Sequence, residues 1–220
     1  MAKNKALGPN GFTIEFYQAA LSFMGNDLLD IVEESRCTKC MHQGLNATFL
    51  ALIPKTGNSD KLQGFKPISL CNVVYKILAT IMVNRLKPIL PDLIAQEQTG
   101  FVKGQQITDG IIVAQEVIHS LKNVSNQGMI IKLDLEKAYD HLSWAYLEGI
   151  LKAHGFDERW VKWILSMVST PVMSVMLNGT PTEAFNPSRG LRQGDPLSPF
   201  LFILAAEGLG RLVKAQVDRD

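Results

Sequence analysis

The chain has 220 residues, of which 46% are hydrophobic and 20% are charged, and its formal net charge is +1. This apolar content excludes a low-complexity or disordered chain and is sufficient for a sizeable core. Because the net charge is close to zero, it argues neither for nor against a nucleic-acid partner.

The three cysteines, Cys37, Cys40 and Cys71, are too few for a disulfide framework in a chain of this length. Cys37 and Cys40 have one zinc-like spacing but no second pair to close a tetrahedral site. The sequence begins without a secretory leader pattern, and its most apolar stretches are short or interrupted by charge. We therefore expect a soluble intracellular protein, in the cytoplasm or nucleus, without a membrane partner.

Positive charge is concentrated between residues 39 and 87, where the only acidic residue is Asp60. A polyanion could dock on such a surface, although a solvated basic face without a ligand fits the charge equally well. The basic residues concerned are Lys39, Lys55, Lys61, Lys66, Lys76, Arg85 and Lys87.

The first half of the chain predicts helices interrupted by a strand. Thr13 can cap a helix over "IEFYQAALSF", and Asn26 a second helix over "DLLDIVEESRC". "ATFLALIPK" is typical of a strand, and "TGNSDKLQG" of a polar loop. Ser69 can then cap a long helix over "LCNVVYKILATIMVNRL", which Pro88 ends.

The next segments predict a helix, a buried strand and two further helices. Thr108 can cap "DGIIVAQEVIHSLKN", and the apolar run after Gly128 is typical of a strand. Ser143 can cap "WAYLEGILKAH", which Gly155 closes, and Asp157 can cap "ERWVKWILSMV".

The last segments predict a hairpin and a long helix. "VMSVML" followed by Asn178 and Gly179 is a hairpin signal, because both residues tolerate the positive φ of a tight turn. Ser198 and Pro199 can begin a helix over "FLFILAAEGLGRLVKAQ". The pattern as a whole favours the α/β class of the α+β type.

Asp134, in "LDLEKAYD", lies near the end of the predicted strand between Leu133 and Leu135. A buried carboxylate is costly unless a positive group meets it. Asp134 therefore either caps the following turn or holds a metal ion, and the local sequence leaves both open.

The loop "SRGLRQGDPLSP" at residues 188–199 combines turn formers with Arg189 and Arg192 and leads directly into a helix N-terminus. Backbone donors and the helix dipole favour anions at such a place. The loop is suited to contact a phosphate or a base edge, although an ordinary helix-entry loop has the same pattern.

Five segments resemble, in collinear order, the reverse transcriptase domain of LINE-type non-LTR retrotransposons, most closely the plant ones. They are "KALGPNGF", "ALIPK" with "GFKPISLCNVVYKILATIMVNRL", "QTGFVKGQQITDGIIVAQE", "KLDLEKAYDHLSW" and "RGLRQGDPLSPFLFILAAE". The resemblance implies a right-hand polymerase, helix-rich with a small antiparallel sheet. Residues 1–125 would be an N-terminal extension and fingers-like region, and residues 126–220 a partial palm. The implied activity is RNA-directed DNA polymerase, with an RNA template, a DNA primer and dNTPs as partners.

The resemblance also implies roles for matching residues. Asp134 would be a catalytic ligand of Mg²⁺, assisted by the Leu135 carbonyl, since two-metal nucleotidyl transfer relies on carboxylates to hold the cations. Tyr139 would lie beside the sugar of the incoming nucleotide and exclude a 2′-hydroxyl, whereas Asp140 is expected to be a turn residue. The other residues expected to bind nucleotide or template are Lys55, Lys66, Arg192, Gln193 and Gly194.

The family pattern also requires an Ala-Asp-Asp block, and no Asp-Asp pair occurs in this sequence. Leu7, Asn10, Lys66 and Gln105 replace the family's Pro, Asp, Arg and Arg, and lysine lacks the planar fork of arginine. We therefore expect a truncated domain, without thumb or endonuclease, whose Mg²⁺ site is incomplete and which is inactive by itself. The alternative is a non-catalytic RNA-binding module. An incomplete palm also predicts an unpaired, aggregation-prone sheet edge around residues 172–177.

Overall fold

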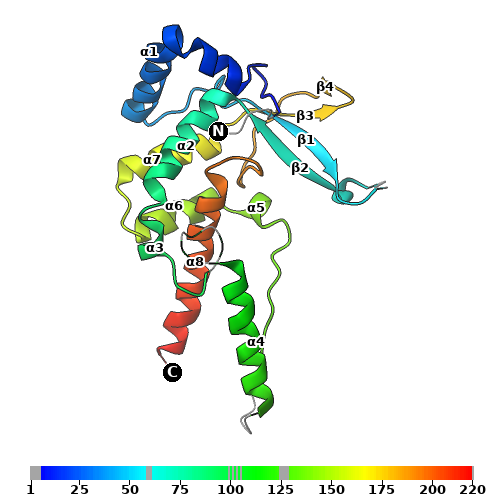
Figure 1. Ribbon diagram of the computed structural model, residues 1–220, viewed down its shortest axis with the longest axis vertical. Coiled ribbons are helices and arrows are strands. Elements are labelled where there is room, and N and C mark those ends of the chain that lie inside the picture. Colours follow the sequence, from blue (N-terminus) through cyan, green and yellow to red (C-terminus); the bar gives the residue numbers. More distant parts are fainter. Residues whose placement is uncertain are drawn as a thin grey trace.

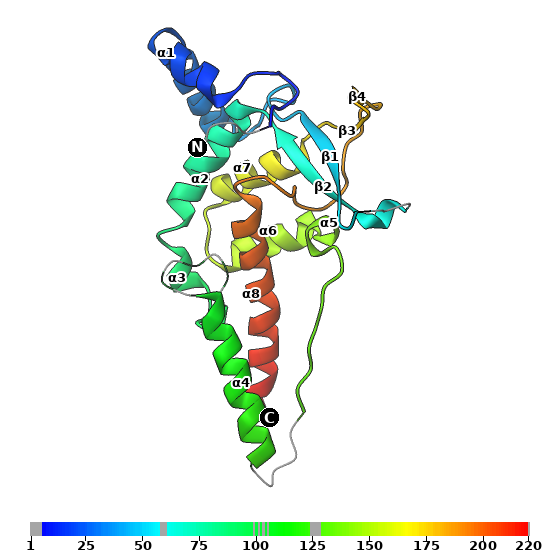
Figure 2. The same cartoon turned by 45° about the vertical axis from the view of Figure 1, so that its right-hand side comes forward.

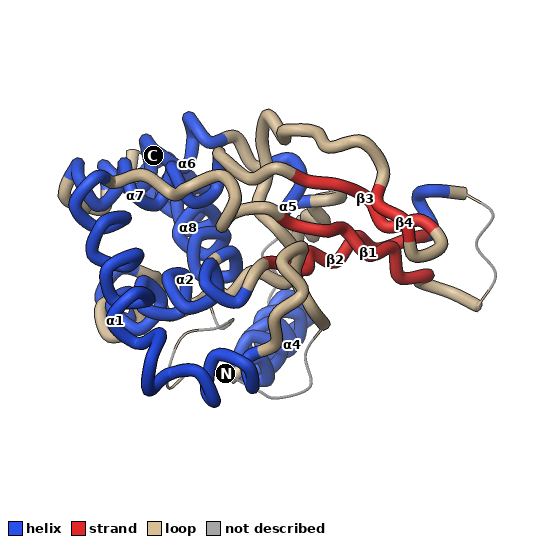
Figure 3. The backbone as a smooth tube through the Cα atoms, turned by 90° about the horizontal axis from the view of Figure 1, so that it is seen from above, coloured by secondary structure: helices blue, strands red, loops and turns tan. Residues whose placement is uncertain are grey.

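The computed structural model describes residues 6–57, 61–98, 100, 102, 104, 106–123 and 129–219. The helices are α1 (Ile14–Thr38), α2 (Val73–Leu86), α3 (Leu90–Leu93), α4 (Ile107–Asn123), α5 (Ala138–His141), α6 (Trp144–Ala153), α7 (Glu158–Ser169) and α8 (Ser198–Val217). The strands are β1 (Thr48–Pro54), β2 (Phe65–Cys71), β3 (Met173–Leu177) and β4 (Thr180–Pro181), and a short 3₁₀ turn, Leu62–Gly64, precedes β2. Figure 3 shows the strands gathered on one side of the molecule and most helices on the other. The helix-rich α/β class predicted from the sequence is confirmed.

The sheet has the strand order β2-β1-β3-β4. β1 pairs antiparallel with β2 and parallel with β3, while β3 and β4 form a hairpin. The sheet is therefore mixed, whereas the sequence predicted an antiparallel one; a parallel pair needs a long crossover connection, which residues 55–172 provide. Because β3 lies between β1 and β4, the predicted unpaired edge around residues 172–177 was wrong. The edges of the sheet are β2 and β4.

The main hydrophobic core surrounds α2, whose Leu78 is fully buried. α6, α7 and α8 contribute Leu151, Ile164 and Leu201 to the same cluster. Burial of each such side chain contributes about 2 kcal/mol of hydrophobic free energy. Since the cluster takes residues from both sides of position 125, the two regions predicted from the sequence share one core.

α1 is one continuous helix of 25 residues. Thr13 is confirmed as its N-cap, because its Oγ1 accepts a hydrogen bond of 3.1 Å from the Phe16 N–H. Asn26 lies inside the helix, so the predicted second start was wrong. An Asn or Gly within a helix costs at most about 1 kcal/mol, and Leu28 and Ile31 after this point still pack against α2.

Residues 65–71 form β2, so the prediction that Ser69 caps a long helix was also wrong. β1 offers these residues a complete antiparallel ladder, with Leu52 opposite Pro67. This pairing overrides the helical periodicity of the sequence. α2 begins only after Asn72, whose side-chain amide donates to the Gly44 carbonyl at 3.2 Å.

Residues 129–135 are extended, but they pair with no strand of the described chain, so the predicted buried strand was wrong. Met129, Ile131 and Leu133 are 82%, 67% and 72% exposed. An extended segment becomes part of a sheet only when another strand satisfies its backbone groups. Figures 1 and 2 show this segment returning from the far end of α4 toward α5. Gly128, expected to start the strand, lies outside the described residues.

The predicted N-caps of α6 and α7, Ser143 and Asp157, are confirmed. Ser143 accepts from the Tyr146 N–H at 3.4 Å, and Asp157 accepts from the Arg159 N–H at 2.9 Å. The predicted start after Thr108 was two residues too late, because α4 begins at Ile107.

The hairpin prediction at residues 178–179 is confirmed, with φ of 49° at Asn178 and 81° at Gly179. The start of α8 differs from the prediction. Ser198 is its first residue, and its Oγ makes no hydrogen bond to any described residue. The N-cap residue is Leu197, without a side-chain cap bond, and its own N–H donates to Asp195 Oδ1 at 2.9 Å.

Candidate functional site

The candidate site forms where the loop before α8 crosses α5. The Gly190 N–H donates to the Leu142 carbonyl, and the Leu191 N–H donates to the Tyr139 carbonyl, both at 2.8 Å. These bonds join the segments "LDLEKAYD" and "RGLRQGDP", which lie about fifty residues apart in the sequence. The sequence treated them as separate motifs, and the fold makes them one site.

Glycine at position 190 makes this crossing possible. Its φ is 93°, and a Cβ there would lie 2.8 Å from the Asp140 carbonyl oxygen. A side chain would therefore force the loop away from α5. Trp144 Nε1 donates to the Gly190 carbonyl at 2.8 Å and fixes the loop from the other side.

A cavity of about 320 Å³ opens beside this crossing. Its lining brings together four of the residues predicted to bind nucleotide or template, which come from β2, α5 and the loop: Lys66, Tyr139, Gln193 and Gly194. Ile68, Ala138 and Pro199 add apolar surface. A cavity with one cation, one aromatic ring, one amide and mainly apolar walls suits a flat, negatively charged ligand. We call it the Tyr139 cavity.

The ring of Tyr139 is held by stacking. Its centroid lies 4.9 Å from that of Phe202 on α8, with an angle of 17° between the planes. Burial raises the pKa of the Tyr139 hydroxyl, so the side chain is neutral at physiological pH. The cavity is therefore bounded by an uncharged ring in a fixed plane.

The turn at Gln193 and Gly194 is in direct contact with β2. The Ser69 N–H donates to the Gln193 carbonyl at 2.7 Å. Gly194 has a φ of 103°, and a Cβ there would lie 3.1 Å from the Ser69 carbonyl oxygen. Glycine lets the turn approach β2 closely, which leaves the Gln193 side chain free to face the cavity.

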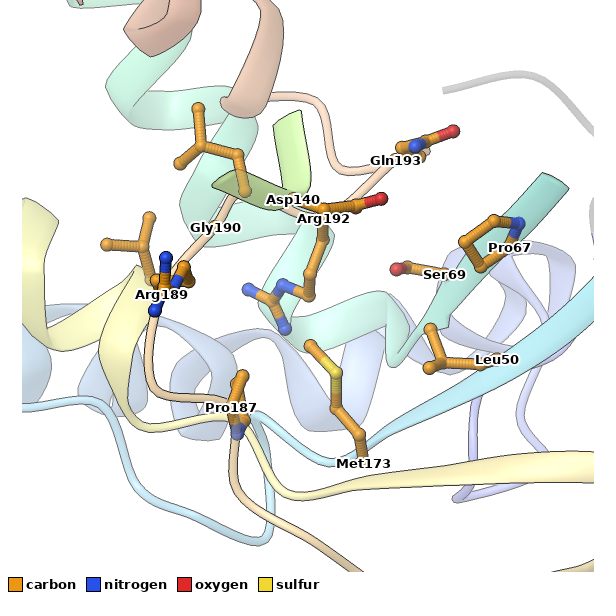
Figure 4. Close-up of a pocket in the computed structure, with 12 residues that line it drawn as sticks. Leu50, Pro67, Ser69, Asp140, Met173, Pro187, Arg189, Gly190, Arg192 and Gln193 are labelled. Atoms are coloured by element: carbon orange, nitrogen blue, oxygen red, sulfur yellow. The ribbon is translucent and has the colours of Figure 1, made fainter. Parts of the chain in front are cut away.

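Arg192, predicted to bind nucleotide or template, is buried, with its side chain only 3% exposed. Its guanidinium donates to Asn46 Oδ1 at 2.7 Å and to Thr48 Oγ1 at 3.0 Å. Figure 4, a close-up of a neighbouring cavity of about 130 Å³, shows Arg192 and Gln193 leaving consecutive positions in different directions. The donors of Arg192 are thus used inside the protein, away from the Tyr139 cavity.

Asp134 and Leu135 lie on the extended segment before α5, and both side chains are exposed. The N-cap position of α5 is Lys137, with no side-chain cap bond, so Asp134 does not cap this helix. Among the described residues no group of three or more His, Cys, Asp or Glu side chains could hold a metal ion. The described residues therefore do not form a two-metal site by themselves.

The predicted basic residues are distributed over several elements. Lys55 follows β1, where its Nζ donates to the Gln63 carbonyl at 3.0 Å, and it does not line the Tyr139 cavity. Lys76 lies on α2 and lines a second cavity of about 360 Å³. The two cavities share Ile68 and Gly194, so they adjoin at this turn.

Sequence reasoning missed Phe202 and Pro199. Both lie on the first turns of α8, three residues apart, and therefore on one face of the helix. That spacing could have indicated that the two side chains lie on the same surface of the helix. It could not have indicated that Phe202 stacks on Tyr139, which depends on the tertiary contact. Asp140, expected to be a turn residue, is part of α5 and lines the cavity of Figure 4 with Arg189.

A family model described as "Reverse transcriptase (RNA-dependent DNA polymerase)" matches residues 53–219. The chain belongs to the reverse transcriptase family. All three segments that build the Tyr139 cavity fall within the matched residues. The resemblance to a reverse transcriptase domain identified from the sequence is thereby confirmed.

Relatives of this reverse transcriptase chain include proteins of a transposon and of retrotransposable elements. A "Transposon TX1 uncharacterized 149 kDa protein" of Xenopus laevis is 31% identical over 207 residues, which are 94% of this chain and 16% of that protein. The "Retrovirus-related Pol polyprotein from type-2 retrotransposable element R2DM" of Drosophila melanogaster is 31% identical over 165 residues, or 75% of this chain and 15% of that protein. A Pol polyprotein of a type-1 element R2 from Popillia japonica is 28% identical over 152 residues, 69% of this chain and 21% of its own length. The chain thus spans a small part of each relative.

Reverse transcriptases act on nucleic acids and use divalent metal ions. None of the helices described here is both long enough and apolar enough to cross a bilayer.

Proposed function

We propose that this chain is the fingers and part of the palm of an RNA-directed DNA polymerase, with residues 1–125 as an N-terminal extension and fingers-like region and residues 126–220 as a partial palm. The Tyr139 cavity would hold the incoming dNTP. Lys66 would meet its phosphates, Tyr139 its sugar, and the Gln193–Gly194 turn its base. The observation that carries this proposal is that one cavity unites side chains from three distant segments, each of the chemical type that a nucleotide needs.

The second cavity supports a place for the RNA template. It adjoins the Tyr139 cavity at Gly194 and has mainly apolar walls, including Leu7, Phe12 and Val73. Apolar and aromatic walls suit an unstacked base, and a lysine such as Lys76 suits its phosphate. A template base there would lie across the turn from the dNTP, with the DNA primer on the palm side.

Asp134 would supply one ligand to Mg²⁺, with the Leu135 carbonyl beside it. Its exposure leaves the carboxylate accessible to an ion. One carboxylate does not hold two ions in register, so further acidic residues would have to join it. We therefore propose that the isolated chain binds nucleotide and template but does not extend a primer.

RNA affinity measured against salt concentration tests the nucleic-acid part of this proposal. Lys76→Ala removes the proposed phosphate contact of the template, so we expect weaker RNA binding and a slope of log K against log[salt] that is shallower by about 1. Fluorescence anisotropy with a labelled single-stranded RNA gives both quantities. Lys162→Ala is the matched control, because Lys162 is exposed on α7 and lines neither cavity. Equal slopes for both variants would contradict the assignment of Lys76.

A primer-extension assay tests the catalytic part. Mg²⁺, dNTPs and a primed RNA should give no product with the purified chain. Template-dependent extension would show that the chain suffices for chemistry by itself and would overturn this part of the proposal. Salt-sensitive RNA binding without dNTP binding would instead favour the non-catalytic RNA-binding module, which the lack of an acidic cluster among the described residues also allows.

A further inference from the structure

The turn that faces the Tyr139 cavity is flanked on both sides by buried ions. Arg192 and Asp195 have side chains only 3% and 0% exposed, and Arg192 Nη2 lies 3.3 Å from Asp195 Oδ2. Gln193 and Gly194, which lie between these two ions in the sequence, line the cavity. The two ends of the turn are thus inside the protein, while its middle is at the site.

The Arg192 guanidinium connects this turn to two other parts of the fold. Nη1 donates to Asn46 Oδ1 and Thr48 Oγ1, at the start of β1, at 2.7 and 3.0 Å. Nη2 donates to the Met167 carbonyl on α7 at 3.2 Å. Only a planar group with several donors in a fixed fork can make these bonds at once, so lysine is no substitute.

Tyr75 on α2 completes the network. The guanidinium carbon of Arg192 lies 4.0 Å from the centre of the Tyr75 ring, and the Tyr75 hydroxyl donates to Asp195 Oδ2 at 2.5 Å. Burial raises the pKa of Tyr75 well above its usual value, so the hydroxyl remains a donor. The pKa of Arg192 is also raised: burial alone would lower it, but Tyr75, Cys71 and Asp195 outweigh that effect.

Stability alone does not explain such a network. Buried ion pairs lose so much hydration that well-packed apolar residues of similar volume are often equally or more stable. An ion pair instead fixes the relative position of the groups that it joins, because its hydrogen bonds are satisfied in only one arrangement.

We propose that Arg192 is a positioning residue for nucleotide binding. Held by Asn46, Thr48, Met167, Tyr75 and Asp195, it fixes the Gln193–Gly194 turn against β2 and opposite Tyr139, without contacting the ligand itself. This inference rests on the proposed function of the Tyr139 cavity. The role of Arg192 in holding the turn against β2 can be measured separately from nucleotide binding. The hydrogen bond from the Ser69 N–H to the Gln193 carbonyl reports on it.

The test compares Arg192→Lys and Tyr75→Phe with a core control, Val83→Ala, which lies farther along α2 and outside the network. Binding of the fluorescent nucleotide mant-dGTP with Mg²⁺ is measured at a temperature where circular dichroism shows every variant folded. We expect at least a tenfold loss of affinity for Arg192→Lys, about threefold for Tyr75→Phe, and none for Val83→Ala. Affinity of Arg192→Lys within twofold of the unsubstituted chain, or an equal loss in the control, would overturn the proposal.

Hydrogen exchange at the Ser69 amide separates this inference from the proposed function. Arg192→Lys should speed that exchange at least tenfold, whereas Val83→Ala should leave it unchanged. If the unsubstituted chain does not bind mant-dGTP, the proposed function fails, and the Ser69 amide still decides whether Arg192 holds the turn. Unchanged Ser69 exchange in Arg192→Lys would refute the positioning role.

Discussion

The ring of Tyr139 shows how a single side chain of the site is controlled by its neighbour. Tyr139 belongs to a segment whose preceding residues are exposed, so its backbone alone does not fix the ring. The stack on Phe202 does so, from a helix that begins about sixty residues later. Parallel stacking of this kind contributes about 1 kcal/mol beyond the buried area.

On the proposed function of the Tyr139 cavity, with the ring beside the sugar of a dNTP, Phe202→Leu should reduce the preference for dGTP over GTP. A leucine lets the Tyr139 ring tilt away from the sugar, and we expect the ratio of the two dissociation constants to fall about threefold, against tenfold or more for Tyr139→Ala. Isothermal titration with each nucleotide measures the ratio.

Phe156→Leu is the control for this comparison. It removes one ring of another stack, in which Phe156 and Trp160 lie 5.0 Å apart at 16°, and neither residue lines the Tyr139 cavity. If Phe156→Leu changed the ratio as much as Phe202→Leu, the effect would be one of stability and not of the site.

At the scale of elements, the decisive feature is the crossing of the 187–197 loop over α5. The loop is irregular and α5 has only one turn, so neither is rigid alone. The two backbone bonds between them, with the close approach at Gly190, give the site its shape. The crossing therefore depends on one residue without a side chain.

Gly190→Ala and Gly179→Ala form a matched pair that tests this dependence. Both glycines have positive φ, 93° and 81°, so both variants incur the left-handed backbone cost of about 1–2 kcal/mol. Only at position 190 would the new Cβ meet another atom, since nothing lies within 4 Å at position 179. We expect Gly190→Ala to be less stable by about a further 1–3 kcal/mol in urea unfolding. Equal losses would mean that the loop can move off α5 at no cost.

At the scale of the whole molecule, the described part of the chain leaves a large apolar surface uncovered. α4 and the C-terminal half of α8 extend away from the remaining helices, and residues 129–135 return alongside (Figures 1 and 2). Their exposed apolar side chains include Ile112, Val113, Leu133, Leu212 and Val213. An exposed patch of this kind marks a contact surface or an aggregation liability.

We therefore expect the isolated chain to self-associate at micromolar concentration. Leu133→Lys should shift the sedimentation profile toward the monomer, because a charge is costly inside an apolar contact. Phe23→Lys is the control, since Phe23 on α1 is 73% exposed and Leu133 is 72% exposed. An equal shift for both variants would indicate a general effect of charge and not a specific surface.

The sequence alone determined the features that depend on near neighbours in the chain. Thr13, Ser143 and Asp157 were recognisable as caps because a cap bonds a backbone group two or three residues away. The turn at Asn178 and Gly179 was recognisable because its φ angles restrict the residue types. The family was recognisable because its motifs are short and contiguous.

Tertiary structure decided what depends on distant partners. β2 is a strand because β1 lies beside it, and residues 129–135 lack a partner within the described chain and remain unpaired. Arg192 is buried because Asn46, Thr48 and Asp195 converge on it, although its sequence context suggests an exposed ligand contact. Strand pairing and ion burial both depend on groups from remote parts of the chain, so the residues nearby in sequence do not reveal them.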